Sequence, residues 1–441
     1  MKTPICDFVK KYIEKDSVRL HMPGHKGNGK GEAYDITEID GADVLYYSDG
    51  IIKESQDCAG KIFGTYKTVY STEGSSLSIR AMVYLAKKLG VEKGNAPKIL
   101  AGRNAHKTFV LATALMGVEI GWLFSDDEGL TSCKICPEYL EEEIKREKPV
   151  AVYITSPDYL GNVLDIEEIS EVCHRNGCVL MVDNAHGAYL KFMEKSAHPI
   201  DLGADICCDS AHKTLPCLTG SGYLHISHNA PELLKKEAEE AMAMFSSTSP
   251  SYLILQSIDR FNGMWEEYKE RVASVAKKIE EMKKELSSYK FIGDEFLKLT
   301  IDAKAYGYTG NEIADYLKDK NIICEFSDPD YVVMMFSSET SDEDIEKLKE
   351  AFLSLEKKPE IRIKPPKVKK PVVKVLSKDA IYMPKDKVSV DEAKGKILAS
   401  AEVFCPPAIP VLVCGEEIDD SAIECFKYYG IKECSVLFDK S

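Results

Sequence analysis

The chain has 441 residues, of which 44% are hydrophobic, and a formal net charge of −15. This length exceeds what one compact core needs, so two or three domains are expected, and the apolar content excludes a disordered chain. The strong negative charge argues against a nucleic-acid partner, which requires a basic face.

The N-terminus and the cysteines bear on the compartment. Charges recur every few residues in the first 20 positions, so the apolar segment of a signal peptide is missing. No run approaches about 20 apolar residues, so no membrane-spanning helix is expected. Several of the 14 cysteines, including Cys178, Cys207 and Cys208, lie in apolar runs where a free thiol acts as a small hydrophobic group. We therefore expect reduced thiols, a cytoplasmic protein and no association with membranes.

Helical and strand-like patterns alternate through the first half of the chain. Residues 4–16 have the pattern of a short amphipathic helix, and a loop rich in glycine and histidine follows. From about residue 76, the predicted helices SLSIRAMVYLAKKLG and DIEEISEVCHRNG alternate with the predicted strands KILAG, PVAVYIT, CVLMVD and ADICCD. This alternation predicts an α/β fold with a mostly parallel sheet, whose active-site residues gather where the strands end.

The second half has a different pattern. A long charged helix is predicted over 262–285, followed by the short strands LKLTIDA and YVVMMF and two further helices, which indicate a small α+β domain. A basic, proline-rich stretch then has the composition of an extended linker. The predicted parts are an N-terminal segment (1–50), a large domain (51–261), a small α+β domain (262–356), a linker (357–374) and a C-terminal domain (375–441).

Two short motifs suggest ligands that the rest of the sequence does not support. GHKGNGKG (24–31) nearly matches a nucleotide phosphate loop, but Gly31 replaces the hydroxyl residue that holds magnesium, and no strand precedes it. CKIC (133–136) is a single cysteine pair without the further ligands that zinc needs. No metal is expected.

Polar residues follow the ends of several predicted strands. His106, His186 and His212 do so, although each taken singly is more often structural than catalytic. Asp183 ends the buried run CVLMVD, where a carboxylate is costly unless it is paired. It can be a helix cap, half of a salt bridge, or the partner of a buried cationic group. Lys213 follows the next strand among small residues, and a desolvated lysine can act as a nucleophile.

An aspartate and a lysine at successive strand ends suit pyridoxal phosphate. The lysine bonds to the aldehyde, and the aspartate keeps the pyridine nitrogen protonated so that the ring can accept electrons. The phosphate also needs donors. Gly74 allows close approach of the backbone, and Ser75 and Ser76 open a helix whose N-terminus favours an anion. Ser210 and His212 can add side-chain donors.

Successive blocks of the sequence resemble the Orn/Lys/Arg decarboxylase family. Over about residues 21–260 they read HMPGHKG, DITEIDGADVLYYSDGIIKESQ, EGSS, RNAHKT, TSPDYLG, DNAHGAY, SAHKTLPCLTGSGYLH and SSTSPSYLILQSID. ILASAEVFCPPAIPVLVCGEEI resembles the C-terminal domain of the family. The resemblance implies a pyridoxal-phosphate enzyme of fold type I, that of aspartate aminotransferase. Its large domain would hold a mostly parallel seven-stranded sheet, and the chain would be a short form without the N-terminal wing domain.

The resemblance also implies roles for single residues. Lys213 would bond to the cofactor, Asp183 would pair with its pyridinium, and His106 would stack on one face of the ring. Ala185 would pack on the other face, with His186 nearby. The residues implied for the phosphate are Ser75, Ser76, Ser210, His212 and, reaching the site of the neighbouring subunit, Ser247. The site would therefore be built across a homodimer.

Four places depart from the family pattern. Glu73 stands where an asparagine usually precedes the phosphate-loop glycine, Asp158 turns the usual SPTY into SPDY, and Asn184 replaces an acidic residue. FCPPA (404–408) replaces PYPPG. These changes bear on substrate choice and leave the implied cofactor residues intact.

The choice of reaction has support apart from the resemblance. Aminotransferases of this fold usually bind the substrate carboxylate with an arginine of the small domain, but no arginine lies between Val272 and Ile361. A carboxylate that leaves as carbon dioxide gains from desolvation instead. We predict decarboxylation of arginine, lysine or ornithine to an amine of polyamine metabolism, with Glu416 or Asp43 as candidates for binding the distal cation. The alternatives are another fold type I enzyme (an aminotransferase or lyase) and a relative that binds the cofactor without turnover.

Overall fold

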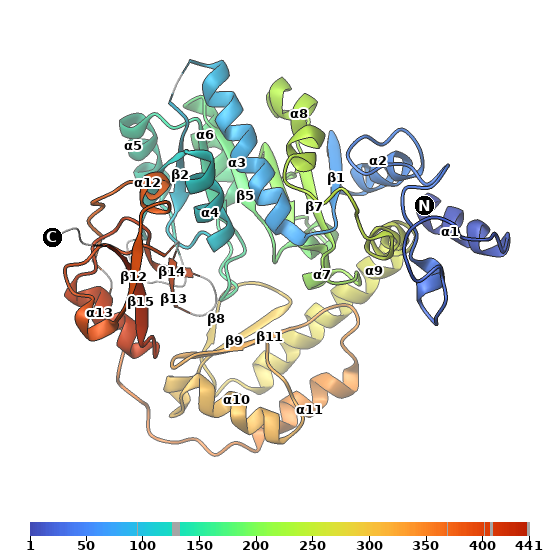
Figure 1. The fold of residues 1–441 in the computed structure, drawn as a ribbon. Coiled ribbons are helices and arrows are strands. Elements are labelled where there is room, and N and C mark those ends of the chain that lie inside the picture. The colour runs from blue at the N-terminus through green and yellow to red at the C-terminus, as the bar shows by residue number, and fades with distance from the viewer. Residues whose placement is uncertain (95, 126–132, 368, 401, 406–408, 439–441) are drawn as a thin grey trace. The chain divides into compact units, whose positions relative to one another are not determined.

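The computed structural model describes residues 1–94, 96–125, 133–367, 369–400, 402–405 and 409–438. Figure 1 shows their helices and strands, coloured along the chain. They fall into two compact units. The first unit contains residues 1–94 and 166–273, and the second contains 95–165 and 274–441. None of the described helices is both long enough and apolar enough to cross a membrane.

The first unit contains four strands and the helices around them. Its strands are β1 (Lys67–Ser71), β5 (Val179–Asp183), β6 (Ile206–Asp209) and β7 (Gly222–Ile226). Its helices are α1 (Pro4–Glu14), α2 (Ile51–Phe63), α3 (Gly74–Glu92), α6 (Ile166–Arg175), α7 (Ala211–Thr214), α8 (Glu232–Ala243) and the first part of α9 (Tyr252–Glu285), with the short 3₁₀ turns η1 (Glu32–Tyr34) and η2 (Ala188–Phe192). Every residue of β5, β6 and β7 is buried, which explains their continuous apolar sequences.

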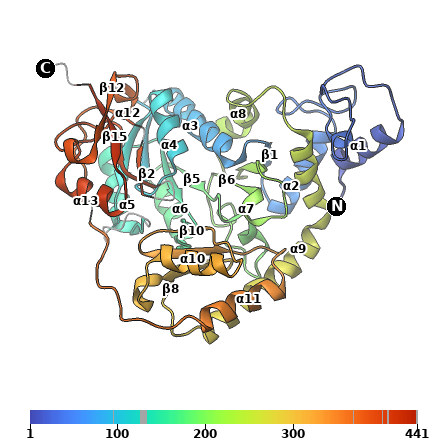
Figure 2. The ribbon, with the colours of Figure 1, turned by 60° about the horizontal axis from the view of Figure 1, so that its bottom comes forward.

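The second unit begins with β2 (Lys98–Gly102), α4 (Lys107–Met116), β3 (Glu119–Leu123), α5 (Pro137–Glu147) and β4 (Ala151–Thr155). A four-stranded sheet, ordered β10-β11-β9-β8, follows. This part contains β8 (Phe291–Ile292), β9 (Lys298–Asp302), η3 (Ala303–Tyr306), α10 (Gly310–Asp319), β10 (Phe326–Ser327), β11 (Tyr331–Met335) and α11 (Asp342–Leu353). Helix α10 lies beside β10 and β11 (Figure 2).

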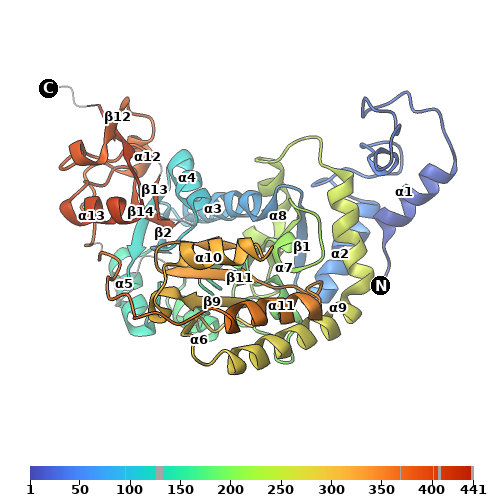
Figure 3. The ribbon, with the colours of Figure 1, turned by 90° about the horizontal axis from the view of Figure 1, so that it is seen from below.

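The C-terminal part of the second unit has its own small core. It contains α12 (Ser377–Ala380), β12 (Lys385–Ser389), η4 (Val390–Glu392), β13 (Glu402–Cys405), β14 (Ile409–Val413), α13 (Asp420–Tyr428) and β15 (Glu433–Leu437). Phe426 and Cys425 of α13 pack with Leu412 of β14 and Val436 of β15. Helix α13 lies beside β13 and β14 (Figure 3). The described residues between α11 and α12, which include most of 357–374, form no helix or named strand.

The strand order β1-β7-β6-β5-β4-β2-β3 gives a seven-stranded sheet. The pairs β5–β6, β2–β4 and β2–β3 are parallel, while β7 runs antiparallel to both β1 and β6. The predicted α/β class with a mostly parallel seven-stranded sheet is therefore confirmed.

The long helix α9 begins at Tyr252, so the predicted start at residue 262 is wrong. The reason is the spacing of the apolar residues in its first turns. Tyr252, Leu255, Ile258 and Phe261 recur every three residues and are fully buried. They therefore continue the helical stripe upstream of the charged stretch from which the helix was predicted.

Candidate active site

The strands β5 and β6 bring the predicted aspartate and lysine to one edge of the sheet. Asp183, the last residue of β5, pairs in register with Cys208 of β6. The short helix α7, which carries Lys213, begins directly after β6. Because parallel neighbouring strands end at the same edge, Asp183 and Lys213 belong to one cluster of strand-end residues.

Lys213 has a specific partner in this cluster. Its Nζ lies 2.9 Å from Nε2 of His186, which follows β5 in the turn after Asp183. His186 is buried and Lys213 is half-buried. A protonated Lys213 donates to Nε2 in this geometry, so the imidazole can orient the amine and accept a proton from it.

Asp183 is a buried carboxylate held at the end of its strand. Its Oδ1 accepts from the backbone N–H of Ala185 at 3.2 Å and from the thiol of Cys208, whose Sγ is 3.7 Å away. Burial raises the pKa of Cys208 well above its ordinary value, so that side chain stays a neutral donor. The carboxylate therefore stands as an oriented acceptor at the strand end, which is the chemistry that a pyridinium partner requires.

Hydroxyl groups and a glycine meet at the N-terminus of α3. Ser210 Oγ donates to Ser75 Oγ at 2.8 Å, and the amide of Ser75 points to Ser210 Oγ at 3.4 Å. Gly74 has a φ of +64°, and a Cβ at this position would meet the ring of His212 at 3.5 Å. Gly222 packs so closely that a Cβ there would lie 2.8 Å from the carbonyl carbon of Gly74. Small residues, two hydroxyls and a helix N-terminus meet here, and such a set can bind an anion. We call it the anion cradle.

His212 is part of this cradle in its neutral form. Burial lowers the pKa of the imidazole, and its Nδ1 donates to the carbonyl of Ser221 at 2.8 Å. Since Nδ1–H is already committed, His212 can donate from Nε2 to a phosphate only as an imidazolium. A bound phosphate would favour that charged form.

Two further residues named for the phosphate have different surroundings. Ser76 lies in the first turn of α3. Ser247 is exposed, and its backbone N–H donates at 2.9 Å to Oε1 of Glu73 in the same chain. The unusual Glu73 thus holds the loop that carries Ser247. The role of Ser247 at a neighbouring subunit stays a prediction.

His106 belongs to the second unit, so its predicted stacking on the cofactor ring stays a prediction. It caps α4, with Nδ1 accepting from the backbone N–H of Thr108 at 3.2 Å. This contact sets the tautomer, because the ring proton must then sit on Nε2.

Comparison with known families gives the chain an identity. Residues 3–306 match the Orn/Lys/Arg decarboxylase major domain, and residues 347–434 match the C-terminal domain of the same family. The chain belongs to this family. It is a pyridoxal-phosphate-dependent decarboxylase that acts on basic amino acids.

Individual relatives agree with the assignment. The decarboxylase is 28% identical to an arginine decarboxylase of Bacillus subtilis (strain 168), an alignment that covers 96% of this chain and 92% of the relative. Identity with the arginine decarboxylase of Bacillus anthracis is 26%, over 96% and 92% of the two chains. Its fold resembles that of lysine decarboxylase A from Pseudomonas aeruginosa, with a TM-score of 0.81 at 15% identity, covering 99% of this chain and 80% of that one.

The residues of the first unit fit the cofactor that this family uses. A half-buried lysine with a proton acceptor, a buried carboxylate at the end of the preceding strand and the anion cradle at α3 are the three kinds of group that pyridoxal phosphate needs. The structure brings together Asp183, Ala185, His186, Ser75, Ser210, His212 and Lys213 in the first unit.

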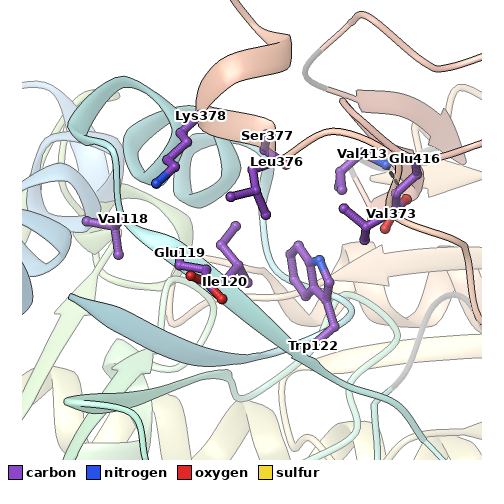
Figure 4. Close-up of a pocket in the computed structure, with 10 residues that line it drawn as sticks. All are labelled: Val118, Glu119, Ile120, Trp122, Val373, Leu376, Ser377, Lys378, Val413 and Glu416. Atoms are coloured by element: carbon purple, nitrogen blue, oxygen red, sulfur yellow. Dashed lines mark hydrogen bonds between the residues drawn. The ribbon is translucent and has the colours of Figure 1, made fainter. Parts of the chain in front are cut away.

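The two carboxylates suggested for the distal cation of the substrate already have partners within the chain. Both oxygens of Glu416 accept from Arg103, at 2.9 and 2.8 Å, beside a cavity of about 30 Å³ (Figure 4). Asp43 accepts several backbone N–H groups around the start of α2, including those of Gly50 and Ile52 at 2.9 Å. The role of either carboxylate toward the substrate stays a prediction. Residues 406–408 of the altered FCPPA block lie outside the described residues.

One buried group near the site was missed in the sequence. Among the described residues, His198, Cys207 and Asp209 lie close enough together to hold a metal ion. The hydrogen bond from His198 to Asp209 explains this proximity without a metal. The signal was present, since Asp209 ends the apolar run ADICCD just as Asp183 ends CVLMVD. His198 lies 11 positions before Asp209, in a loop, so no short sequence motif joins the two side chains.

Proposed function

We propose that this decarboxylase acts on arginine in preference to lysine or ornithine, at a site built on Lys213, Asp183 and His186. The observation that carries the site is the 2.9 Å contact between Nζ of Lys213 and Nε2 of His186 beside the buried Asp183. The preference for arginine is inferred from the similarity to arginine decarboxylases of Bacillus subtilis and Bacillus anthracis.

Each side chain of the site has a task. When bound, pyridoxal phosphate supplies a cationic ring that accepts the electron pair left on the substrate when carbon dioxide departs. Lys213 provides the amine that holds the cofactor, and Asp183 keeps its ring nitrogen protonated. Ser75, Ser210 and the N-terminus of α3 bind the phosphate.

The proton that replaces the lost carboxylate also needs a carrier. Nζ of Lys213 and Nε2 of His186 are within hydrogen-bond distance, so a proton can be held by the pair and passed on from Nζ. The absence of arginine between Val272 and Ile361 supports decarboxylation over transamination. We further propose a cytoplasmic role in which the product amine enters polyamine metabolism.

A substrate comparison tests this proposal. The purified holoenzyme is incubated separately with arginine, lysine and ornithine, and carbon dioxide and amine are measured. We expect release from all or some of these substrates, with the highest kcat/KM for arginine. Faster turnover of lysine or ornithine would overturn the preference. Accumulation of a keto acid without carbon dioxide would indicate transamination, and no product at all would contradict the catalytic assignment.

We also propose that the enzyme is a homodimer in which Ser247 completes the neighbouring site. The segment 18–47 exposes several large apolar side chains, namely Val18, Leu20, Met22, Tyr34 and Tyr47. Exposed apolar side chains in such number are typical of a surface that another chain covers.

Light scattering coupled to gel filtration tests the dimer. We expect a mass of twice the 49.2 kDa of one chain, and a shift towards the monomer when Leu20 and Tyr47 are both changed to aspartate. The exposed pair Lys394 and Asp420 provides a control, since Lys394→Asp should leave the mass unchanged. A wild-type mass of one chain at micromolar concentration would disprove the dimer.

A further inference from the structure

Several buried polar side chains converge on the carboxylate of Asp209, the last residue of β6. Its Oδ1 accepts from Nδ2 of Asn184 at 2.6 Å. Its Oδ2 accepts from Nε2 of His198 at 3.1 Å and from Nε2 of His225 at 3.2 Å. All four residues are fully buried. We call Asn184, His198, Asp209 and His225 the Asp209 cluster.

The hydrogen bonds determine the charge of the Asp209 cluster. An ionised carboxylate only accepts, so both imidazoles carry their proton on Nε2. Nδ1 of His225 is then free to accept from Oγ1 of Thr68 at 2.9 Å, and burial lowers the pKa of this histidine. Burial alone would raise the pKa of Asp209, but attraction to His198 and hydrogen bonds from both histidines outweigh it and hold the pKa well below its usual range. His225 is therefore neutral, and the carboxylate of Asp209 carries a negative charge.

The Asp209 cluster and the side chain of Asp183 lie on opposite faces of the sheet, at the same strand ends. Asp183 pairs in register with Cys208 and contacts its thiol, so these two side chains share one face of the sheet. Side chains alternate along a strand, which places Asp209 on the opposite face. Asn184, the neighbour of Asp183, reaches Asp209 on that face.

We propose that Asp209 is a positioning residue for the cofactor site, linking the end of β5 to the start of α7. Through Asn184 it holds the turn that presents Asp183, Ala185 and His186. Asp209 directly precedes Ser210 in the chain, so fixing Asp209 also fixes the start of the turn from Ser210 to Lys213. Its negative charge would also favour the protonated form of a cofactor nitrogen held by Asp183. This inference rests on the proposed assignment of Asp183 and Lys213 to the cofactor.

The chain contains a matched control for this role. Asp205 stands at the other end of β6, is also buried, and also accepts from a histidine, Nε2 of His174, at 3.0 Å. It accepts from the backbone N–H of Leu180 at 2.8 Å as well. Asp205→Asn therefore removes a buried, hydrogen-bonded carboxylate that directly precedes the same strand, at the end away from Asp183 and Lys213.

The test compares Asp209→Asn with Asp205→Asn in the full chain. Apoenzyme is titrated with pyridoxal phosphate to obtain the dissociation constant, and the visible absorbance of the holoenzyme is followed against pH. Thermal unfolding of both apo forms is recorded. We expect both variants to unfold at lower temperature than wild type. Only Asp209→Asn should raise the dissociation constant, by about 10-fold, and move the midpoint of the absorbance titration.

Asn184→Ala is the second variant, because it breaks the link to β5 and leaves both histidines on Asp209. It should weaken cofactor binding in the same direction, which keeps the proposal testable if Asp209→Asn does not fold. Unchanged cofactor affinity and titration in Asp209→Asn and Asn184→Ala would show that the cluster serves folding alone. An unchanged absorbance in Asp183→Asn would instead refute the underlying site assignment.

Discussion

Replacement of Lys213 by alanine is expected to lower kcat by about three orders of magnitude or more, the scale on which residues that act in proton transfer and covalent catalysis contribute. The variant loses the amine that contacts Nε2 of His186 at 2.9 Å. In the proposed site this amine is both the attachment point of the cofactor and the proton carrier. Carbon dioxide release from arginine measures the loss, and the visible absorbance of the cofactor should disappear with it.

Lys195→Ala is the control for this prediction. Lys195 is an exposed lysine of the same unit, so its removal should change neither kcat nor the absorbance. A Lys213→Ala protein that keeps wild-type turnover would place the essential amine elsewhere in the chain.

Glu416→Ala is expected to reduce the free energy of unfolding by about 3–5 kcal/mol, because it leaves the guanidinium of Arg103 without its counter-charge in a buried position. The side chains of Arg103 and Glu416 are only 11% and 1% exposed. Arg103 also packs over the ring of Trp122, 4.8 Å from its centroid, and donates to the carbonyl of Val411 at 3.1 Å. Urea unfolding followed by fluorescence measures the change.

An exposed ion pair of the same unit gives the scale for comparison. Lys394 and Asp420 lie 2.7 Å apart with side chains 63% and 70% exposed, so Asp420→Ala should cost less than about 1 kcal/mol. Equal losses for Glu416→Ala and Asp420→Ala would mean that the buried pair adds no more to stability than a surface contact.

The strands that carry the site could be predicted because their apolar runs are short, uninterrupted and bounded by polar residues. The runs CVLMVD and ADICCD correspond to β5 and β6, and parallel connection alone was enough to place Asp183 near Lys213. The strands β1 and β7 gave no such signal. KTVYS is interrupted by polar residues, and most of GYLHI lies inside a block that was interpreted as a cofactor motif.

The Asp209 cluster shows the limit of local patterns. His198 comes from a loop and His225 from β7, an antiparallel strand that was not predicted. Their meeting point depends on the register of three strands, which no spacing in the sequence encodes. The same holds for Arg103 and Glu416, which are 313 positions apart.

The ion pair between Arg103 and Glu416 joins the C-terminal part of the chain to the end of β2. The stretch from Glu360 to Lys370 is largely exposed and has no helix or strand among its described residues, while side-chain contacts join the C-terminal part to β2 and β3. The peptide connection is therefore not the main source of cohesion. Two separate genes, one ending and the other beginning within this stretch, could encode a long N-terminal chain and a short C-terminal chain that assemble into the same second unit.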